Sequence, residues 1–70
     1  MFYKHPQVTQ NAVAVARKAM KLTQADLAQT VDVTRQTIIA IEKGNYTPSI
    51  MLALKLAQAL KKGVEELFWL

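Results

Sequence analysis

Apolar residues recur along this chain at spacings of three and four positions, which is the period of one face of an α-helix. The segments with this period cover residues 9–20, 24–31, 35–43, 48–61 and 64–70, the last as a short helical turn or tail. The first opens at Thr9 or Gln10 and ends near Met20. Residues 1–8 lack the period and contain a Pro, which favours an extended arm. The pattern predicts an all-α fold, a compact bundle of five short helices over residues 9–70, with no strand of convincing length.

The expected inner faces of two segments are apolar with one exception. The face of the first segment carries Val13, Ala16, Arg17 and Met20, and that of the fourth carries Leu52, Leu56, Ala57 and Leu60. Arg17 is the exception, and a cation on an apolar face requires a partner inside the fold.

Start and stop signals divide the segments. Thr23 and Thr34 each precede the apolar positions of a short helix, where a hydroxyl can accept a hydrogen bond from an orphaned backbone N–H. Thr47 stands before a Pro, which is favoured in the first helical turn. Gly44 and Gly63 are expected to end the third and fourth helices.

Two capped helices with a tight corner over residues 23–45 indicate a helix-turn-helix. The second of these helices buries Ile38 and Ile41. Its other face carries Arg35, Gln36, Ile39, Ala40 and Lys43. A core does not need that face, which makes it the candidate functional surface.

Composition narrows the function classes. The chain has 70 residues, no Cys and one His, so neither a disulfide framework nor a Cys-ligated or His-rich metal site is expected. The acidic residues are scattered without a nucleophile and base pairing or a Gly-rich phosphate loop, so we expect no enzyme, no cofactor and no metal. A formal charge of +4 favours a polyanionic partner. No apolar run reaches membrane-spanning length and no signal peptide is evident, so we expect a soluble, cytoplasmic protein that binds no membrane.

Several motifs together resemble a known family. They are L-T-Q-A-D-L-A, V-T-R-Q-T-I-x-x-I-E-K-G, Y-T-P-S, and L-A-L-K-L-A-Q-A-L followed by V-E-E-L-F. These resemble the phage-repressor-like DNA-binding domains of the Cro and Xre type over residues 13–68, in particular the small stand-alone regulators of the cytolysin-repressor kind. The resemblance implies a lambda-repressor-like fold in which the second motif helix enters the major groove of DNA.

The resemblance also implies roles for single residues. Arg35 and Gln36 stand at base-reading positions, with Ile39 and Ala40 beside them. Arg can pair with guanine and Gln with adenine through two hydrogen bonds each. The implied contacts to DNA phosphates are Gln24, Thr34, Thr37, Lys43, Asn45 and Tyr46. Arg17 and Glu42 match an ion pair that commonly joins the first and third helices, so both are left outside the binding site.

Three departures from the family pattern leave alternatives open. Lys21 replaces the usual Gly after the first helix, which implies either a differently shaped corner or a mildly strained Lys. Lys61 and Lys62 replace a Gly and an apolar residue, which puts the path into the tail in question. Ile39 stands where a small or polar residue is usual. It fits a contact with a thymine methyl group, and equally a singly exposed Ile.

The main functional hypothesis is a sequence-specific regulator of transcription that binds a palindromic operator in double-stranded DNA as a homodimer. The resemblance implies a repressor, because repression is the usual role in the family. No small-molecule effector or effector domain is evident. The expected dimer surface comprises Met51, Leu54, Phe68, Trp69 and Leu70. Phe2 and Tyr3 either join that surface or lie against the C-terminus, and the apolar tail alternatively packs on the domain's own core. The competing hypothesis is a protein-interaction module, such as an antitoxin or an adaptor of a toxin or transcription component.

Overall fold

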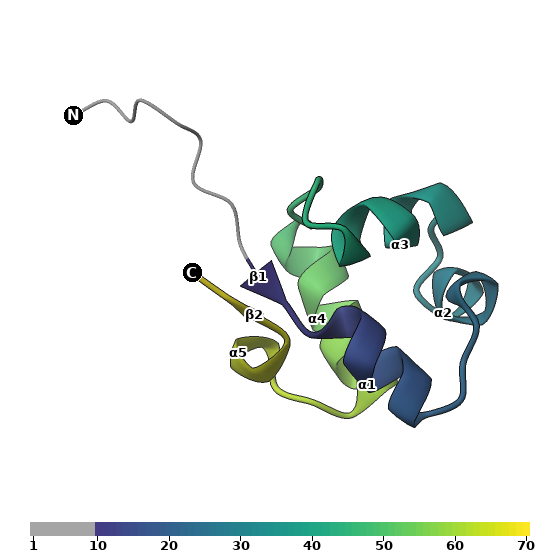
Figure 1. Cartoon of the computed structure of the whole chain (residues 1–70), viewed down its shortest axis with the longest axis horizontal. Helices are drawn as coiled ribbons and strands as arrows, with labels where there is room; N and C mark the ends of the chain where they lie inside the picture. Colours follow the sequence, from purple (N-terminus) through teal and green to yellow (C-terminus); the bar gives the residue numbers. More distant parts are fainter. Residues whose placement is uncertain (1–9) are drawn as a thin grey trace.

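The computed structural model describes residues 10–70, and within them five helices form the bundle that the sequence predicted (Figure 1). The elements in chain order are β1 (Gln10–Asn11), α1 (Val13–Ala19), α2 (Gln24–Thr30), α3 (Arg35–Glu42), α4 (Ile50–Leu60), α5 (Val64–Leu67) and β2 (Phe68–Trp69). The predicted arm, with Phe2 and Tyr3, lies outside the described residues. None of the helices between residues 10 and 70 is long and apolar enough to cross a membrane.

One apolar cluster forms the core between the helices. Its buried members are Val13, Ala16, Leu27, Ala28, Val31, Ile38, Ile41, Leu52, Leu56, Ala57, Leu60 and Leu67. The predicted inner row of α4 is therefore confirmed. On α1, Arg17 is buried as predicted, whereas Met20 is 38% exposed because the helix has ended before it.

The small antiparallel sheet was not predicted, and it corrects the start of the first helix. Gln10 pairs with Trp69 and Asn11 with Phe68, so the backbone before α1 bonds to β2 instead of winding into a helix. Asn11 fixes the helix start because its side-chain oxygen accepts from the N–H of Val13 at 3.2 Å. Strands of two residues are too short to give an alternating pattern, which is why the sequence did not reveal them.

The ends of α4 also differ from the prediction. The cap is Ser49, whose hydroxyl accepts from the N–H of Leu52 at 3.1 Å, and not Thr47. At the other end the chain turns left-handed at Lys61. Gly63 instead begins α5, where its N–H donates to a carboxylate oxygen of Glu66 at 2.8 Å.

The corners after α1 to α4 share one construction. Each contains a residue with positive φ: Lys21 at 60°, Asp32 at 62°, Gly44 at 79° and Lys61 at 57°. The N–H of the next residue then donates to the carbonyl oxygen five positions before it, as from Leu22 to Arg17 at 3.2 Å. This is the left-handed closure typical of helix ends. Lys21 is thus a left-handed Lys in an ordinary corner, which resolves the alternative left open by the sequence.

Candidate nucleic-acid interface

Helices α2 and α3 begin at the two predicted caps. The Thr23 hydroxyl accepts from the N–H of Asp26 at 3.0 Å, and the Asp26 carboxylate accepts from the N–H of Thr23 at 2.9 Å. The hydrogen bond from the Thr23 N–H, followed by the Thr23 side chain, lowers the pKa of the Asp26 carboxyl. The Thr34 hydroxyl accepts from the N–H of Thr37 at 3.3 Å and lies 3.1 Å from the Thr37 hydroxyl. Both helices are thereby fixed at their N-termini, which are the ends implied to face DNA.

The inner face of α3 is held by the core, and the outer face is open. Ile38 is fully buried and Ile41 is 1% exposed. Helical geometry directs Gln36 and Lys43 away from these two residues. Of the predicted base-reading residues, Arg35 and Gln36 are exposed, while Ile39 and Ala40 are half-buried. Among the expected phosphate contacts, Thr34, Lys43, Asn45 and Tyr46 are exposed, and Gln24 and Thr37 are half-buried.

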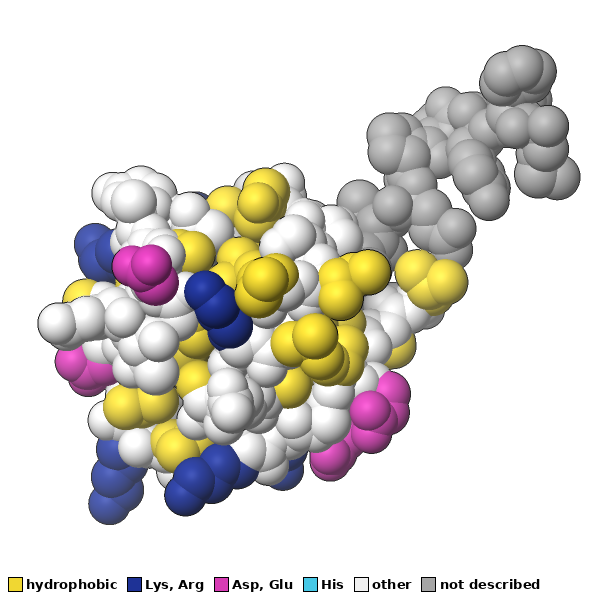
Figure 2. Space-filling view, turned by 180° about the vertical axis from the view of Figure 1, so that it is seen from behind, with side chains coloured by type: hydrophobic (Ala, Val, Ile, Leu, Met, Phe, Trp, Pro, Cys, Tyr) yellow, Lys and Arg dark blue, Asp and Glu magenta, His cyan; other side chains and the backbone are white. Residues whose placement is uncertain are grey.

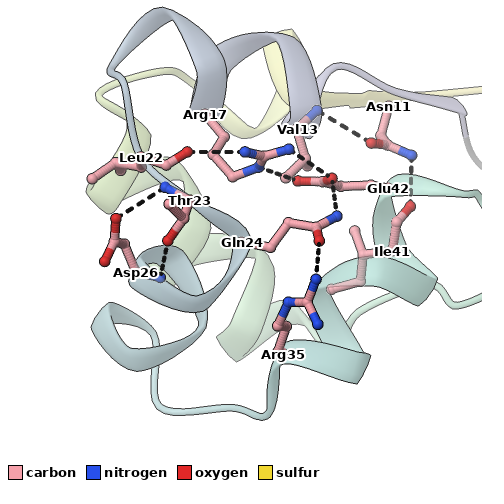
Figure 3. A network of polar contacts seen from close by, with 10 residues as sticks. All are labelled: Asn11, Val13, Arg17, Leu22, Thr23, Gln24, Asp26, Arg35, Ile41 and Glu42. Carbon is pink, nitrogen blue, oxygen red and sulfur yellow. Dashed lines mark hydrogen bonds and ion pairs between the residues drawn. The ribbon is translucent and has the colours of Figure 1, made fainter.

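Arg17 has the partner that the resemblance implied. Its Nε donates to Glu42 Oε2 at 2.7 Å and its Nη2 to Glu42 Oε1 at 3.2 Å, while its Nη1 donates to the carbonyl oxygen of Leu22 at 2.9 Å (Figure 3). The two side chains are only 10% and 8% exposed. The pair thus ties α1 to the last residue of α3, and it gives Arg17 the counter-charge that its place on an apolar face requires.

The surroundings of this ion pair shift both pKa values toward the charged forms. Burial by itself would raise the pKa of Glu42, but hydrogen bonds from Arg17 and Gln24, with the positive charges of Arg17 and Lys18, lower it overall. The hydrogen bond to Glu42 raises the pKa of Arg17, against the smaller effect of burial. Both groups are therefore charged at neutral pH.

The ion pair extends outward through two further side chains. Gln24 Nε2 donates to Glu42 Oε1 at 3.0 Å, and Arg35 Nη2 donates to Gln24 Oε1 at 3.5 Å. Figure 3 shows Arg17, Glu42, Gln24 and Arg35 joined in this order by dashed lines, and the burial of Arg17 and the exposure of Arg35 place the two ends of the series in the interior and at the surface. We call these four residues the polar network. No sequence pattern indicated the link between Gln24 and Arg35, because this link depends on the angle at which α2 and α3 meet.

A second surface carries exposed apolar side chains on α4 and β2. Met51 is 67%, Leu54 56%, Trp69 45% and Leu70 75% exposed, and Ile50, which was not among the predicted dimer residues, is 81% exposed. We call these five residues the apolar patch. Figure 2 shows hydrophobic side chains gathered on the side of the molecule that faces away in Figure 1. The spacing of Ile50 and Leu54, four residues apart and off the inner row, was a signal that could have identified Ile50.

The predicted tail residues divide between core and surface. Phe68 is half-buried and packs against the core cluster, whereas Trp69 and Leu70 remain exposed. Phe68 therefore packs on the domain's own core, which was the alternative to a place in the dimer surface. Within the described part of the chain, no group of acidic or His side chains is arranged to hold a metal ion.

Comparison with known proteins identifies the family. A family model described as "Helix-turn-helix" matches residues 13–67. The chain belongs to the helix-turn-helix family, of the Cro and Xre type. Two regulators are similar to this helix-turn-helix protein over most of its length. YgzD, an HTH-type transcriptional regulator of Bacillus subtilis, is 48% identical over 60 residues, which are 86% of this chain and 91% of that protein. An HTH-type transcriptional regulator of Methanothermobacter thermautotrophicus is 55% identical over 53 residues, 74% of this chain and 77% of that protein.

A solved structure of the same helix-turn-helix fold supports the assignment. The restriction-modification controller protein C.AhdI from Aeromonas hydrophila superposes with a TM-score of 0.72 at 31% sequence identity, covering 77% of this chain and 82% of that one. The predicted fold class is thereby confirmed. The family is one of transcriptional regulators and not of enzymes.

Proposed function

We propose that this helix-turn-helix protein is a sequence-specific regulator of transcription that represses its target as a homodimer on a palindromic operator. The observation that carries the proposal is the construction of α3. Its inner face is fixed by Ile38 and Ile41 and its end by Glu42, while Gln36 and Lys43 project from the outer face. A helix held this rigidly, with polar side chains on its open face, suits insertion into the major groove.

Base reading is assigned to the first turn of α3 and to the positions next to it. Arg35 offers a fork of N–H donors to O6 and N7 of guanine, and Gln36 offers a donor and an acceptor to adenine. Ile39 and Ala40 are half-buried and can supply only apolar contacts, for which a thymine methyl group is the matching partner. Contacts to the DNA backbone are assigned to Gln24, Thr34, Thr37, Lys43, Asn45 and Tyr46.

The apolar patch is assigned to the homodimer. One domain of this size reads only a few base pairs, and a two-fold pair doubles the site and makes it palindromic. An exposed cluster of five large apolar side chains on α4 and β2 is what such a self-complementary contact requires. The two half-sites are then expected about 10 base pairs apart, one turn of the double helix. Repression follows when the bound dimer obstructs RNA polymerase.

The proposal is tested by selecting bound sequences from random duplex DNA and measuring affinity at several salt concentrations. We expect a palindromic site, and log affinity falling linearly with log salt by about 0.9 for each phosphate contacted. A single half-site would contradict the homodimer. A flat salt response without a selected sequence would contradict DNA binding and favour the competing role of a protein-interaction module.

Variants separate the two classes of contact. Arg35→Ala or Gln36→Ala should relax preference at one base pair, by about 1 to 3 kcal/mol. Lys43→Ala should instead weaken all sequences alike and reduce the salt slope by about 1. Equal, sequence-independent losses from both kinds of variant would contradict these assignments.

A reporter gene placed behind the selected site should be expressed less when the protein is present, and higher expression would contradict repression.

A further inference from the structure

Asn11 joins three parts of the fold through its side chain and its backbone. Its Nδ2 donates to the carbonyl oxygen of Ile41 in the last turn of α3 at 2.9 Å, and its Oδ1 accepts from the N–H of Val13 at the start of α1 at 3.2 Å (Figure 3). Its backbone pairs with Phe68 in the small sheet. Because Asn11 is half-buried, water competes less for these bonds than it would at an exposed site. The amide of Asn11 therefore attaches the C-terminal end of α3 to β1.

The bond from Asn11 is additional to the ordinary closure of α3. The carbonyl oxygen of Ile41 already accepts from the N–H of Gly44 at 2.9 Å, so the helix end is complete without Asn11. A carbonyl oxygen has two lone pairs, and Asn11 takes the second one. The Ile41 side chain lies in the core, and the Glu42 carboxylate bonds to Arg17. The contact with Asn11 thus adds a further restraint on the position of α3 and is not required for the helix to form.

The same pair of strands leads from α3 to the apolar patch. Asn11 pairs with Phe68, and the next residue of β2, Trp69, belongs to the patch. The N–H of Ala12 continues the pairing, because it donates to the carbonyl oxygen of Leu67 at 2.9 Å. One residue of β1 therefore connects the end of the helix assigned to DNA with the strand that carries part of the surface assigned to the homodimer.

We infer that Asn11 is a positioning residue that fixes α3 relative to the apolar patch, and that it thereby determines how strictly the homodimer selects the spacing of its half-sites. In a two-fold pair, any freedom of α3 relative to the patch becomes freedom in the distance and rotation between the two recognition helices. One extra base pair between the half-sites rotates them by about 35° and separates them by about 3.4 Å. A rigid pair meets this change only by deforming the DNA, which costs free energy. The inference rests on the proposed function, since it requires a homodimer on palindromic DNA.

The test compares duplexes that differ only in the spacing of their half-sites. The probes are the palindromic duplex selected by the unaltered protein and the same duplex with one base pair inserted at its centre or removed from it. Asn11→Asp keeps the acceptor for the N–H of Val13 and removes the donor to Ile41, so it breaks only the link to α3. We expect the ratio of affinities between selected and altered spacing to fall by about three- to tenfold, the range for one hydrogen bond. Base preference within each half-site should stay unchanged.

Gln10→Glu is the matched control on the same strand. It makes the same change from amide to carboxylate one residue away, but the Gln10 side chain is exposed and makes no hydrogen bond within residues 10–70. The added negative charge weakens binding to all duplexes alike, and the spacing ratio cancels this effect. The ratio should therefore be unchanged in Gln10→Glu. Thermal unfolding and sedimentation show whether each variant is folded and dimeric. If Asn11→Asp does not fold, Asn11→Ala and Gln10→Ala replace the two variants, with the same expected results.

The outcomes separate this inference from the proposed function. If Asn11→Asp is folded and dimeric but keeps the spacing ratio of the unaltered protein, the inference is wrong while the proposed function stands. If Gln10→Glu lowers the ratio equally, the effect comes from charge and not from the link to α3. If Asn11→Asp is monomeric, Asn11 acts in assembly, and the inference is again wrong. If the unaltered protein selects no palindromic site, the proposed function fails, and the inference fails with it.

Discussion

Within residues 10–70, helices α1 to α4 are each followed, one or two positions after their last residue, by a residue in the left-handed conformation, and of these four residues only Gly44 is a glycine. Lys21 and Lys61 take the same conformation with a side chain, which costs about 1 to 2 kcal/mol because Cβ approaches the following carbonyl oxygen. Asp32 is better suited, since short polar side chains tolerate this region. The two strained Lys residues therefore make the folded protein less stable than it would be with glycine at these positions.

Lys61→Gly and Lys21→Gly should each raise the free energy of unfolding by about 0.5 to 1 kcal/mol, because relief of strain exceeds the added entropy of the unfolded chain. Urea denaturation of the variants measures the change. Lys62→Gly is the matched control, because Lys62 is also exposed but has no positive φ, and it should not be stabilising. A Lys61→Gly variant no more stable than Lys62→Gly would contradict the strain argument.

Glu42 makes stability depend on pH. Its pKa is lower in the folded protein than in the unfolded chain, where it is about 4.3. The stabilisation is therefore fully present above that pH and is lost as the pH falls through the lower, folded pKa. Urea denaturation across this acid range should show falling stability, and the decline should be shallower in Glu42→Gln. That variant should cost about 3 kcal/mol at neutral pH, since it leaves Arg17 buried without a counter-charge. An unchanged acid profile in Glu42→Gln would contradict the role of Glu42 in this pH dependence.

The helices that carry the site are defined by their caps. Thr34→Ala should lower the free energy of unfolding by about 1 kcal/mol, because the N–H of Thr37 loses its side-chain acceptor and keeps only the carbonyl oxygen of Thr34. Hydrogen exchange should increase most in the first turn of α3. Thr30→Ala is the control, since the Thr30 hydroxyl donates to the carbonyl oxygen of Asp26 within a helix and caps nothing. Equal losses from both variants would indicate that the cap contributes nothing specific.

The sequence predicted the elements well where a local signal existed. The caps Thr23 and Thr34, the inner row of α4 and the Arg17 to Glu42 pairing were all anticipated, because each depends on spacing or on a recurrent motif. The β1 to β2 pairing and the switch from Thr47 to Ser49 as cap were not, since they depend on where the chain meets distant segments. The link from Gln24 to Arg35 belongs to the same class, because helix packing brings the two residues together.

In the whole molecule, the polar network and the apolar patch belong to different sets of helices, α1 to α3 for the network and α4 with β2 for the patch. This arrangement allows assembly and DNA contact to be disrupted separately. Leu54→Lys, in the apolar patch, should convert the proposed homodimer to a monomer in sedimentation at micromolar concentration and leave unfolding by heat little changed, since Leu54 is 56% exposed.

Val15→Lys is the matched control for this prediction. Val15 is 72% exposed but lies on α1, beside Lys62 and Glu66 and outside the apolar patch. It should leave the sedimentation behaviour as it was. If both variants dissociate the protein, or if the unaltered protein is already monomeric, the patch is not the dimer surface.

The Arg17 to Glu42 pair also has a consequence for temperature. Charged groups are hydrated less favourably as water warms, so the cost of withdrawing this pair from water declines, while hydrophobic stabilisation per unit area levels off. Helix α3 is tied to α1 through this ion pair, whose desolvation cost falls on heating. The orientation of α3 should therefore be among the last features of this fold to loosen in a hot cell.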